Sequence, residues 1–98
     1  MSLPLPGVLL RAAQLSVEHD KPIYLDYYEP SIQKSCCIGI RQDTTKSLVK
    51  SENEYTSSIE AIARCENCYI VSTENSIYIV SSEVPIRNIF PPKQTATS

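Results

Sequence analysis

Short apolar runs separated by turn-forming dipeptides are the feature that most constrains how this chain can fold. The dipeptide Glu-Asn occurs at positions 52–53, 66–67 and 74–75, each time between apolar segments. Asn tolerates the positive φ that tight hairpin turns demand. Because two residues are enough to join antiparallel strands, the pattern predicts an antiparallel meander over residues 56–82.

The register of the last hairpin follows from its turn. With residues 74–75 as a two-residue loop, the cross-strand pairs are Val71 with Tyr78, Ile70 with Ile79, and Tyr69 with Val80. Pairs of apolar and aromatic residues stabilise a sheet by about 0.2–1 kcal/mol each. Within residues 56–64, Ile59, Ala61 and Ala63 occur at every second position, which predicts a half-buried strand.

One helix is predicted near the N-terminus. Residues 8–19, VLLRAAQLSVEH, combine good helix formers with apolar residues at helical spacing. Pro22 cannot continue a helix, so the helix is expected to end by about Asp20. Residues 1–7 precede it as an apolar arm containing Pro4 and Pro6, which favour extended backbone.

β-branched and aromatic residues predict further short strands at 23–28, 35–41 and 47–50, with Glu29-Pro30 ending the first. Gly39 inside the second predicts a bulge, a bend or the close approach of another chain. The apolar residues 86–90 are expected to pack across one end of a barrel. The expected fold is α+β and β-dominated, with a short N-terminal helix and five or six antiparallel strands in a small SH3-like or partly closed barrel.

Length and hydropathy limit the expected organisation of the chain. Its 98 residues fit a single domain, which we expect at residues 8–90, followed by a polar tail at 91–98. No apolar run approaches the roughly 18 residues that a membrane span requires. The first seven residues lack the basic region of a signal peptide, so a cytoplasmic location is expected.

No constellation of catalytic side chains is visible in the sequence. Gly7 and Gly39 are isolated, so there is no Gly-rich phosphate loop, and no Ser–His–Asp order occurs. His19 is the only histidine; a dyad with Cys36 or Cys37 is chemically possible, but a solvated helix end is expected. The sequence therefore predicts a protein that is not an enzyme and uses no cofactor.

The cysteines offer a further alternative for chemistry. Adjacent Cys36 and Cys37 point to opposite faces of a strand, so one metal ion cannot readily reach both. Cys65 and Cys68 form a C-x-x-C across an expected hairpin turn, where they would be directly opposed. Because a tetrahedral zinc site needs four ligands, plain thiols are expected, and zinc- or thiol-dependent activity at Cys65 and Cys68 is the third reading.

Charge argues against nucleic acid as the main partner. Nine Lys and Arg residues against eleven Asp and Glu residues give a net charge of −2, which produces no general attraction for polyanions. An alternative function is a small-barrel nucleic-acid or ligand-binding module. It would use Arg41, Lys46 and Lys50, which could share one face of a hairpin beside tyrosines.

Protein association is the function that the remaining features predict. The candidate contacts are apolar residues of the terminal segments and three tyrosines expected to be exposed: Leu3, Leu5, Leu9, Leu10, Ile89, Phe90, Tyr27, Tyr28 and Tyr55. Apolar arms can lie in grooves of neighbouring subunits or dock on their own domain, and both placements stay open. We expect a non-catalytic interaction protein or a minor structural component of a larger assembly, bound to another protein or to itself.

Several segments, covering about half of the chain, resemble short uncharacterised proteins encoded by large eukaryotic DNA viruses. The matching segments are Lys21-Pro22-Ile23, Asp26-Tyr27, Leu48 to Ser51, Glu54 to Ser57, and Thr73 to Val80. The resemblance implies replication in a host cytoplasm and a role in the virion or in contacts with the host. It implies no active site, and the cysteines lie outside the matching segments.

Overall fold

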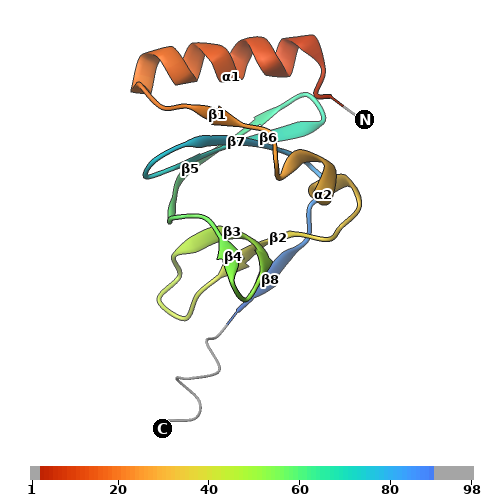
Figure 1. The fold of residues 1–98 in the computed structure, drawn as a ribbon, viewed down its shortest axis with the longest axis vertical. Coiled ribbons are helices and arrows are strands. Elements are labelled where there is room, and N and C mark those ends of the chain that lie inside the picture. The colour runs from red at the N-terminus through yellow and green to blue at the C-terminus, as the bar shows by residue number, and fades with distance from the viewer. Residues whose placement is uncertain (1–2, 90–98) are drawn as a thin grey trace, which may run out of the picture.

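A computed structural model describes residues 3–89 and arranges them in three layers (Figure 1). Helix α1 (Pro6–His19) lies on one face of a four-stranded sheet, sheet A. In spatial order, the strands of sheet A are β1 (Ile23–Tyr24), β7 (Ile77–Ser81), β6 (Cys68–Thr73) and β5 (Ile59–Cys65). Those of sheet B, on the other face, are β4 (Glu54–Tyr55), β3 (Lys46–Ser51), β2 (Cys37–Ile40) and β8 (Ile86–Asn88).

Helix α1 begins two residues earlier than expected and ends where Pro22 predicted. Pro6 occupies the start of the helix, where its missing N–H and fixed φ are favourable. At the other end Asp20 adopts the left-handed conformation with φ 55°, and its N–H donates to the carbonyl of Ser16. This closing turn releases the chain directly into β1.

The predicted antiparallel meander is confirmed by strands β5, β6 and β7. In the β6–β7 hairpin the observed pairs are Tyr69 with Val80, Ile70 with Ile79 and Val71 with Tyr78, as the Glu74-Asn75 turn predicted. In the β5–β6 hairpin Cys65 pairs with Cys68, and Glu66 takes a positive φ of 52°. The observed strands at Cys37–Ile40 and Lys46–Ser51 also match expected ones to within two residues at each end.

The prediction that β5 is half-buried was wrong. The register between β5 and β6 shifts between Ile59 and Ala61, so Glu60 is the extra residue of a β-bulge. The bulge reverses the alternation of side chains: Ile59 packs between the two sheets, whereas Ala61 and Ala63 are exposed on the side of α1. Strand β5 is therefore an edge strand that covers little of either core.

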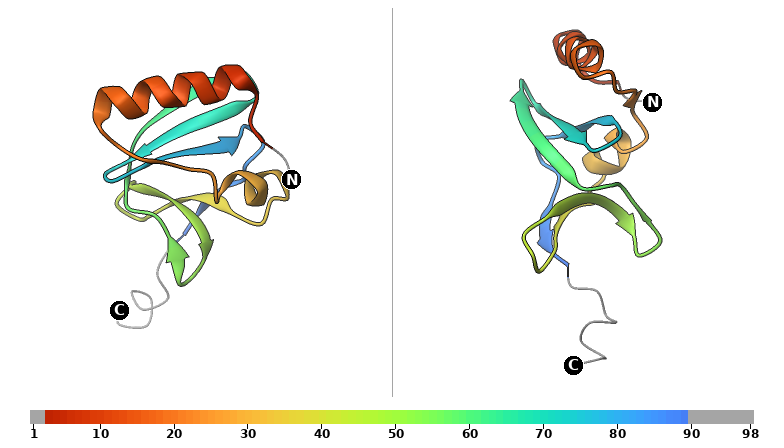
Figure 2. Two further views of the ribbon diagram at one scale, coloured as in Figure 1. Left: turned by 45° about the horizontal axis from the view of Figure 1, so that its top comes forward. Right: turned by 90° about the vertical axis from the view of Figure 1, so that its left-hand side faces the viewer.

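The prediction of an antiparallel barrel was also wrong. Each sheet is mixed because it contains one parallel pair formed by segments far apart in the chain. Ile23 pairs with Ile77 in sheet A, and Ile38 pairs with Ile86 in sheet B. The two sheets stack as separate layers and do not close into a barrel (Figure 2). Residues 86–88 consequently form an edge strand and do not cross a barrel end.

A turn at residues 25–27 and a second helix replace the rest of the strand expected at residues 23–28. The strand ends at Tyr24, and α2 (Tyr28–Ile32) follows after a turn. Pro30 is tolerated because it lies in the first turn, where backbone N–H groups have no partner within the helix. The hydroxyl of Ser31 donates to the carbonyl of Tyr28 and accepts the N–H of Ser81 at 2.8 Å, which ties α2 to the end of β7.

Two apolar cores fill the spaces between the layers. The helix core, between α1 and sheet A, contains Val8, Ala12, Tyr28, Cys68, Ile70, Ile77 and Ile79. The inter-sheet core contains Tyr27, Cys36, Ile38, Leu48, Val71, Val80 and Val84. Strands β6 and β7 contribute to both cores because successive side chains of a strand point to opposite faces. Within residues 3–89 no helix is long and apolar enough to cross a membrane.

Candidate interaction surface

The inner face of α1 explains how the helix is held. Val8 and Ala12 are buried against sheet A, and Leu9 and Leu15 pack beside them. Burial of each large apolar side chain contributes about 1.5–3 kcal/mol. Leu9 was a predicted partner contact, but the structure places it partly inside the protein's own core.

The outer face of the same helix carries a second apolar line. Leu10 is 62% exposed and Val17 is 83% exposed, and Ala13 between them is also exposed. Residues three and four apart lie one above another on a helix, so these three form one line, which we call the outer stripe. Beside it, Nη1 of Arg11 donates to Oε1 of Gln14 at 3.4 Å. The polar neighbours border the stripe without covering it.

The N-terminal arm continues directly into the helix. The carbonyl of Leu5 accepts the N–H groups of Val8 and Leu9 at 3.0 and 3.1 Å. Pro4 is buried, whereas Leu3 and Leu5 are exposed. The arm is therefore attached to its own domain through Pro4, and it presents two leucines at the N-terminal end of α1. Their role in binding a partner stays a prediction, as does that of Leu10.

Two of the three tyrosines expected on the surface are buried. Tyr27 packs edge-on against Tyr78 with ring centroids 5.4 Å apart, and Tyr28 belongs to the helix core. Burial and the nearby Asp26 raise the pKa of Tyr27, and burial raises the pKa of Tyr28. The expectation of exposure was wrong for both because the chain turns into α2 and directs them inward. Tyr55 is 59% exposed on β4.

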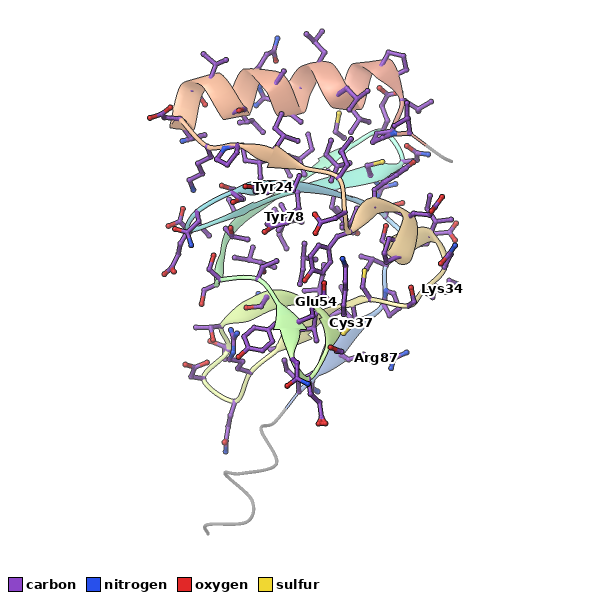
Figure 3. All side chains as sticks on the ribbon, in the orientation of Figure 1. Tyr24, Lys34, Cys37, Glu54, Tyr78 and Arg87 are labelled. Atoms are coloured by element: carbon purple, nitrogen blue, oxygen red, sulfur yellow. The ribbon has the colours of Figure 1, made fainter. Side chains whose placement is uncertain are left out.

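Side chains of several elements lie beside the inter-sheet core on one side of the molecule. Figure 3 shows Tyr24 and Tyr78 together above Glu54 and Cys37 on this side of the molecule. The rings of Tyr24 and Tyr78 have centroids 5.8 Å apart. Burial raises the pKa of Cys37, and Arg87 opposes that shift. This side of the molecule therefore carries two tyrosine rings and a neutral thiol together with charged side chains.

The C-terminal candidates are only partly described. Ile89 is half-buried, and its N–H donates to the carbonyl of Ile40 at 2.8 Å. A Cβ added to Gly39 would lie 2.5 Å from Cδ1 of Ile89, so the residue that approaches Gly39 closely belongs to the same chain, whereas the sequence predicted a bulge, a bend or another chain. Ile89 thus docks on its own domain. Phe90 lies outside the described residues.

The three candidate cations do not form one free basic face. Nζ of Lys50 lies 3.6 Å from carboxylate oxygens of both Asp26 and Glu54, and 4.4 Å from the ring centroid of Tyr27. Lys46 is exposed four residues before Lys50 on the same strand. Nη1 of Arg41 donates to Oγ1 of Thr45 at the β2–β3 turn. Lys50 is already neutralised, which leaves little local positive charge for a phosphate.

The cysteines are free thiols, and three of them, Cys36, Cys65 and Cys68, lie in or against the two cores. Cys65 and Cys68 are directly paired across the β5–β6 turn, as expected from their spacing. Cys36 is buried in the inter-sheet core, where burial raises its pKa to about 11. Between residues 3 and 89 no three His, Cys, Asp or Glu side chains group as metal ligands would.

Sequence reasoning missed the open border of sheet A. Beside β5 lies an open hollow of about 420 Å³, lined by Thr44, Thr45 and Lys46 from one side and by residues 59–62 from the other. One signal for this border was available in the sequence. Ala61 and Ala63 are small, whereas a strand that faces a core usually carries larger apolar side chains. The bulge at Glu60, which exposes them, could not be read from the pattern.

Over residues 3–89 the fold is a three-layer arrangement in which strand β5 pairs on one side only and helix α1 has an apolar outer face. Comparisons of the chain with protein-family models, with curated proteins and with solved structures found no match. The function therefore has to be argued from the surface itself.

Proposed function

We propose that this chain is a non-catalytic interaction domain that binds an apolar helical segment of another protein along the outer stripe of α1. The observation that carries the proposal is the pair of apolar faces on one helix. Val8 and Ala12 hold α1 to the domain, so Leu10 and Val17 are not needed for the helix core and yet are strongly exposed. Exposed apolar lines of this kind mark interaction sites in soluble proteins.

The chemistry of the stripe specifies the kind of partner. Leu10, Ala13 and Val17 have the i, i+3, i+7 spacing of a helix seam, into which a second helix inserts side chains of the same spacing. Ala13 in the middle allows close approach of the two backbones. Arg11 and Gln14 beside the stripe favour a partner helix with acidic or amide side chains flanking its apolar line.

Leu3 and Leu5 are proposed to extend this surface beyond the first turn of the helix. The resemblance to short proteins of large DNA viruses makes a component of the virion or of the host cytoplasm the first class of partner to examine. Nucleic-acid binding through Arg41, Lys46 and Lys50 stays an alternative proposal, and its signature would be an affinity that falls steeply with salt.

The test is site-specific photocrosslinking in the cells that make the protein. A photoreactive residue at Leu10 should form an adduct with one protein, and the same residue at Gln42, exposed in the β2–β3 turn and remote from α1, should not. Val17→Glu should remove the adduct because it places a charge on the stripe, whereas the matched Gln42→Glu should leave it. Equal adducts from both positions, or an adduct that survives Val17→Glu, would contradict the proposal.

A further inference from the structure

The β5–β6 turn brings two of the four cysteines together. Cys65 ends β5, Cys68 begins β6, and the two residues are direct partners across the hairpin. Directly opposed residues of an antiparallel pair point to the same face of the sheet. Cys68 belongs to the helix core and Cys65 packs against that core, so both thiols lie on the side of sheet A that faces α1.

The separation of this pair suits a disulfide that is readily reduced. Directly opposed residues have Cβ atoms about 4.5–5.5 Å apart, whereas a disulfide joins Cβ atoms that are about 3.5–4.5 Å apart. The two strand ends therefore have to approach each other by about 1 Å, next to a turn of only two residues. Disulfides that form against the preferred geometry of the backbone are the ones that small thiols reduce readily.

The two thiols differ in their access to solvent. Cys65 is half-buried, whereas Cys68 is 0% exposed and burial raises its pKa. Because the thiolate is the attacking species and has to reach its target, Cys65 is the thiol that meets a disulfide in solution. The thiol of Cys68 donates to Oδ1 of Asn67 at 3.4 Å, and Asn67 is exposed in the turn. The proton of Cys68 therefore points toward the surface.

The other two cysteines provide an internal comparison. Cys36 is buried in the inter-sheet core, and the adjacent Cys37 begins β2 and is half-buried. Successive side chains of an extended chain point to opposite faces, so the sulfur atoms of this pair diverge. Cys37 thus resembles Cys65 in exposure but has no thiol opposite it.

We propose that Cys65 and Cys68 form a reversible intrachain disulfide by exchange with a small-molecule disulfide of the glutathione class. The thiolate of Cys65 attacks one sulfur of glutathione disulfide, and the first glutathione leaves as a thiolate. Cys68 then gives up its proton and attacks the sulfur of Cys65, which releases the second glutathione. Two electrons pass from the two cysteines to the glutathione disulfide, and their two protons go to the departing thiolates.

This inference does not depend on the proposed function because the outer stripe of α1 takes no part in it. The test is mass spectrometry of the full chain after reduction, removal of the reductant and incubation of the folded protein with glutathione disulfide. Trypsin cleaves after Lys and Arg, so residues 65–87 form one peptide with Cys65 and Cys68, and residues 35–41 form another with the remaining two cysteines.

The peptide 65–87 should lose two hydrogen atoms and retain no glutathione, and dithiothreitol should restore both thiols. Cys68→Ala removes the second thiol, so Cys65 should then keep one glutathione. Cys65→Ala should slow modification of the peptide at least about tenfold because the remaining thiol is buried. The matched control, Cys37→Ala, should leave the oxidation of peptide 65–87 unchanged.

Three results would overturn the proposal. In the first, peptide 65–87 of the unmodified chain keeps both thiols. In the second, the bond forms within peptide 35–41 or between two copies of the chain instead. In the third, folded Cys68→Ala retains no glutathione. The measurement on the unmodified chain needs no variant, so it decides the question even where a substitution in the core prevents folding.

Discussion

Lys50 shows how a single residue can serve the interior and the surface together. Its ammonium lies over the ring of Tyr27 and within 3.6 Å of carboxylate oxygens of Asp26 and Glu54. The aliphatic part of a lysine can cover apolar surface while its charge stays near water. The residue that resembled a nucleic-acid contact in the sequence therefore acts as a cover for the inter-sheet core.

The raised pKa of Cys36 predicts how the stability of the fold depends on pH. Burial raises the pKa of its thiol from 9.0 to about 11, so the folded chain holds this proton more tightly than the unfolded chain does. Between pH 9 and pH 11 the unfolded state loses the proton first, and stability falls as pH rises; below this window Cys36 contributes no pH dependence. Thermal unfolding followed by circular dichroism should show a flat midpoint up to about pH 9 and a decline above it.

The control for this pH dependence is Cys36→Val, which is similar in volume and has no proton to lose. Its midpoint should decline less steeply over the first part of the window. Burial also raises the pKa of Tyr27 and Tyr28, so some decline persists at higher pH in both proteins. An identical slope in the variant and the unmodified chain would show that Cys36 is not the group that titrates.

Central and edge strands of sheet A should respond differently to the same substitution. Ile70 in β6 is 2% exposed, and Ile62 in β5 is 40% exposed. Ile70→Ala should lower the free energy of unfolding by about 2–4 kcal/mol because it leaves a cavity in the helix core. Ile62→Ala should lower it by less than about 1 kcal/mol.

Urea denaturation measures the effect of both substitutions on the free energy of unfolding. A loss of stability at Ile62 as large as that at Ile70 would mean that β5 is covered by something other than solvent.

The three layers should unfold together because β6 and β7 belong to both cores. Val8→Ala affects the helix core and Leu48→Ala affects the inter-sheet core, and both side chains are fully buried. Each should lower the midpoint of one common transition, and the free energy of unfolding should fall by about 1–3 kcal/mol for Val8→Ala and about 2–4 kcal/mol for Leu48→Ala.

Two spectroscopic probes can test this cooperativity. Far-ultraviolet circular dichroism reports on the whole backbone, and the chain has no Trp, so its fluorescence comes from tyrosines such as Tyr27 and Tyr28, one in each core. The two curves should coincide in both variants. A separate early transition in either variant would mean that the layer nearest the substitution unfolds on its own.

Several features of the molecule follow from short stretches of sequence. The end of α1 at Asp20 follows from Pro22, and the register of the β6–β7 hairpin follows from a two-residue turn between apolar runs. The direct opposition of Cys65 and Cys68 follows from the same rule. These outcomes depend on residues within a few positions of one another, so the local sequence contains the information that determines them.

Contacts between distant segments decided the rest. Tyr27 and Tyr28 could be read as part of a strand, but Ser31 binds the end of β7 and the two rings fill different cores. The parallel pairs of β1 with β7 and of β2 with β8 join segments that are far apart in the chain. The bulge at Glu60 likewise depends on how β5 meets β6. The sequence alone determined the helix, the hairpins and the apolar residues that are available to form a surface. Long-range packing decided which of those residues are exposed and that, among residues 3–89, β5 pairs on one side only. The reason is that burial depends on which elements cover which faces.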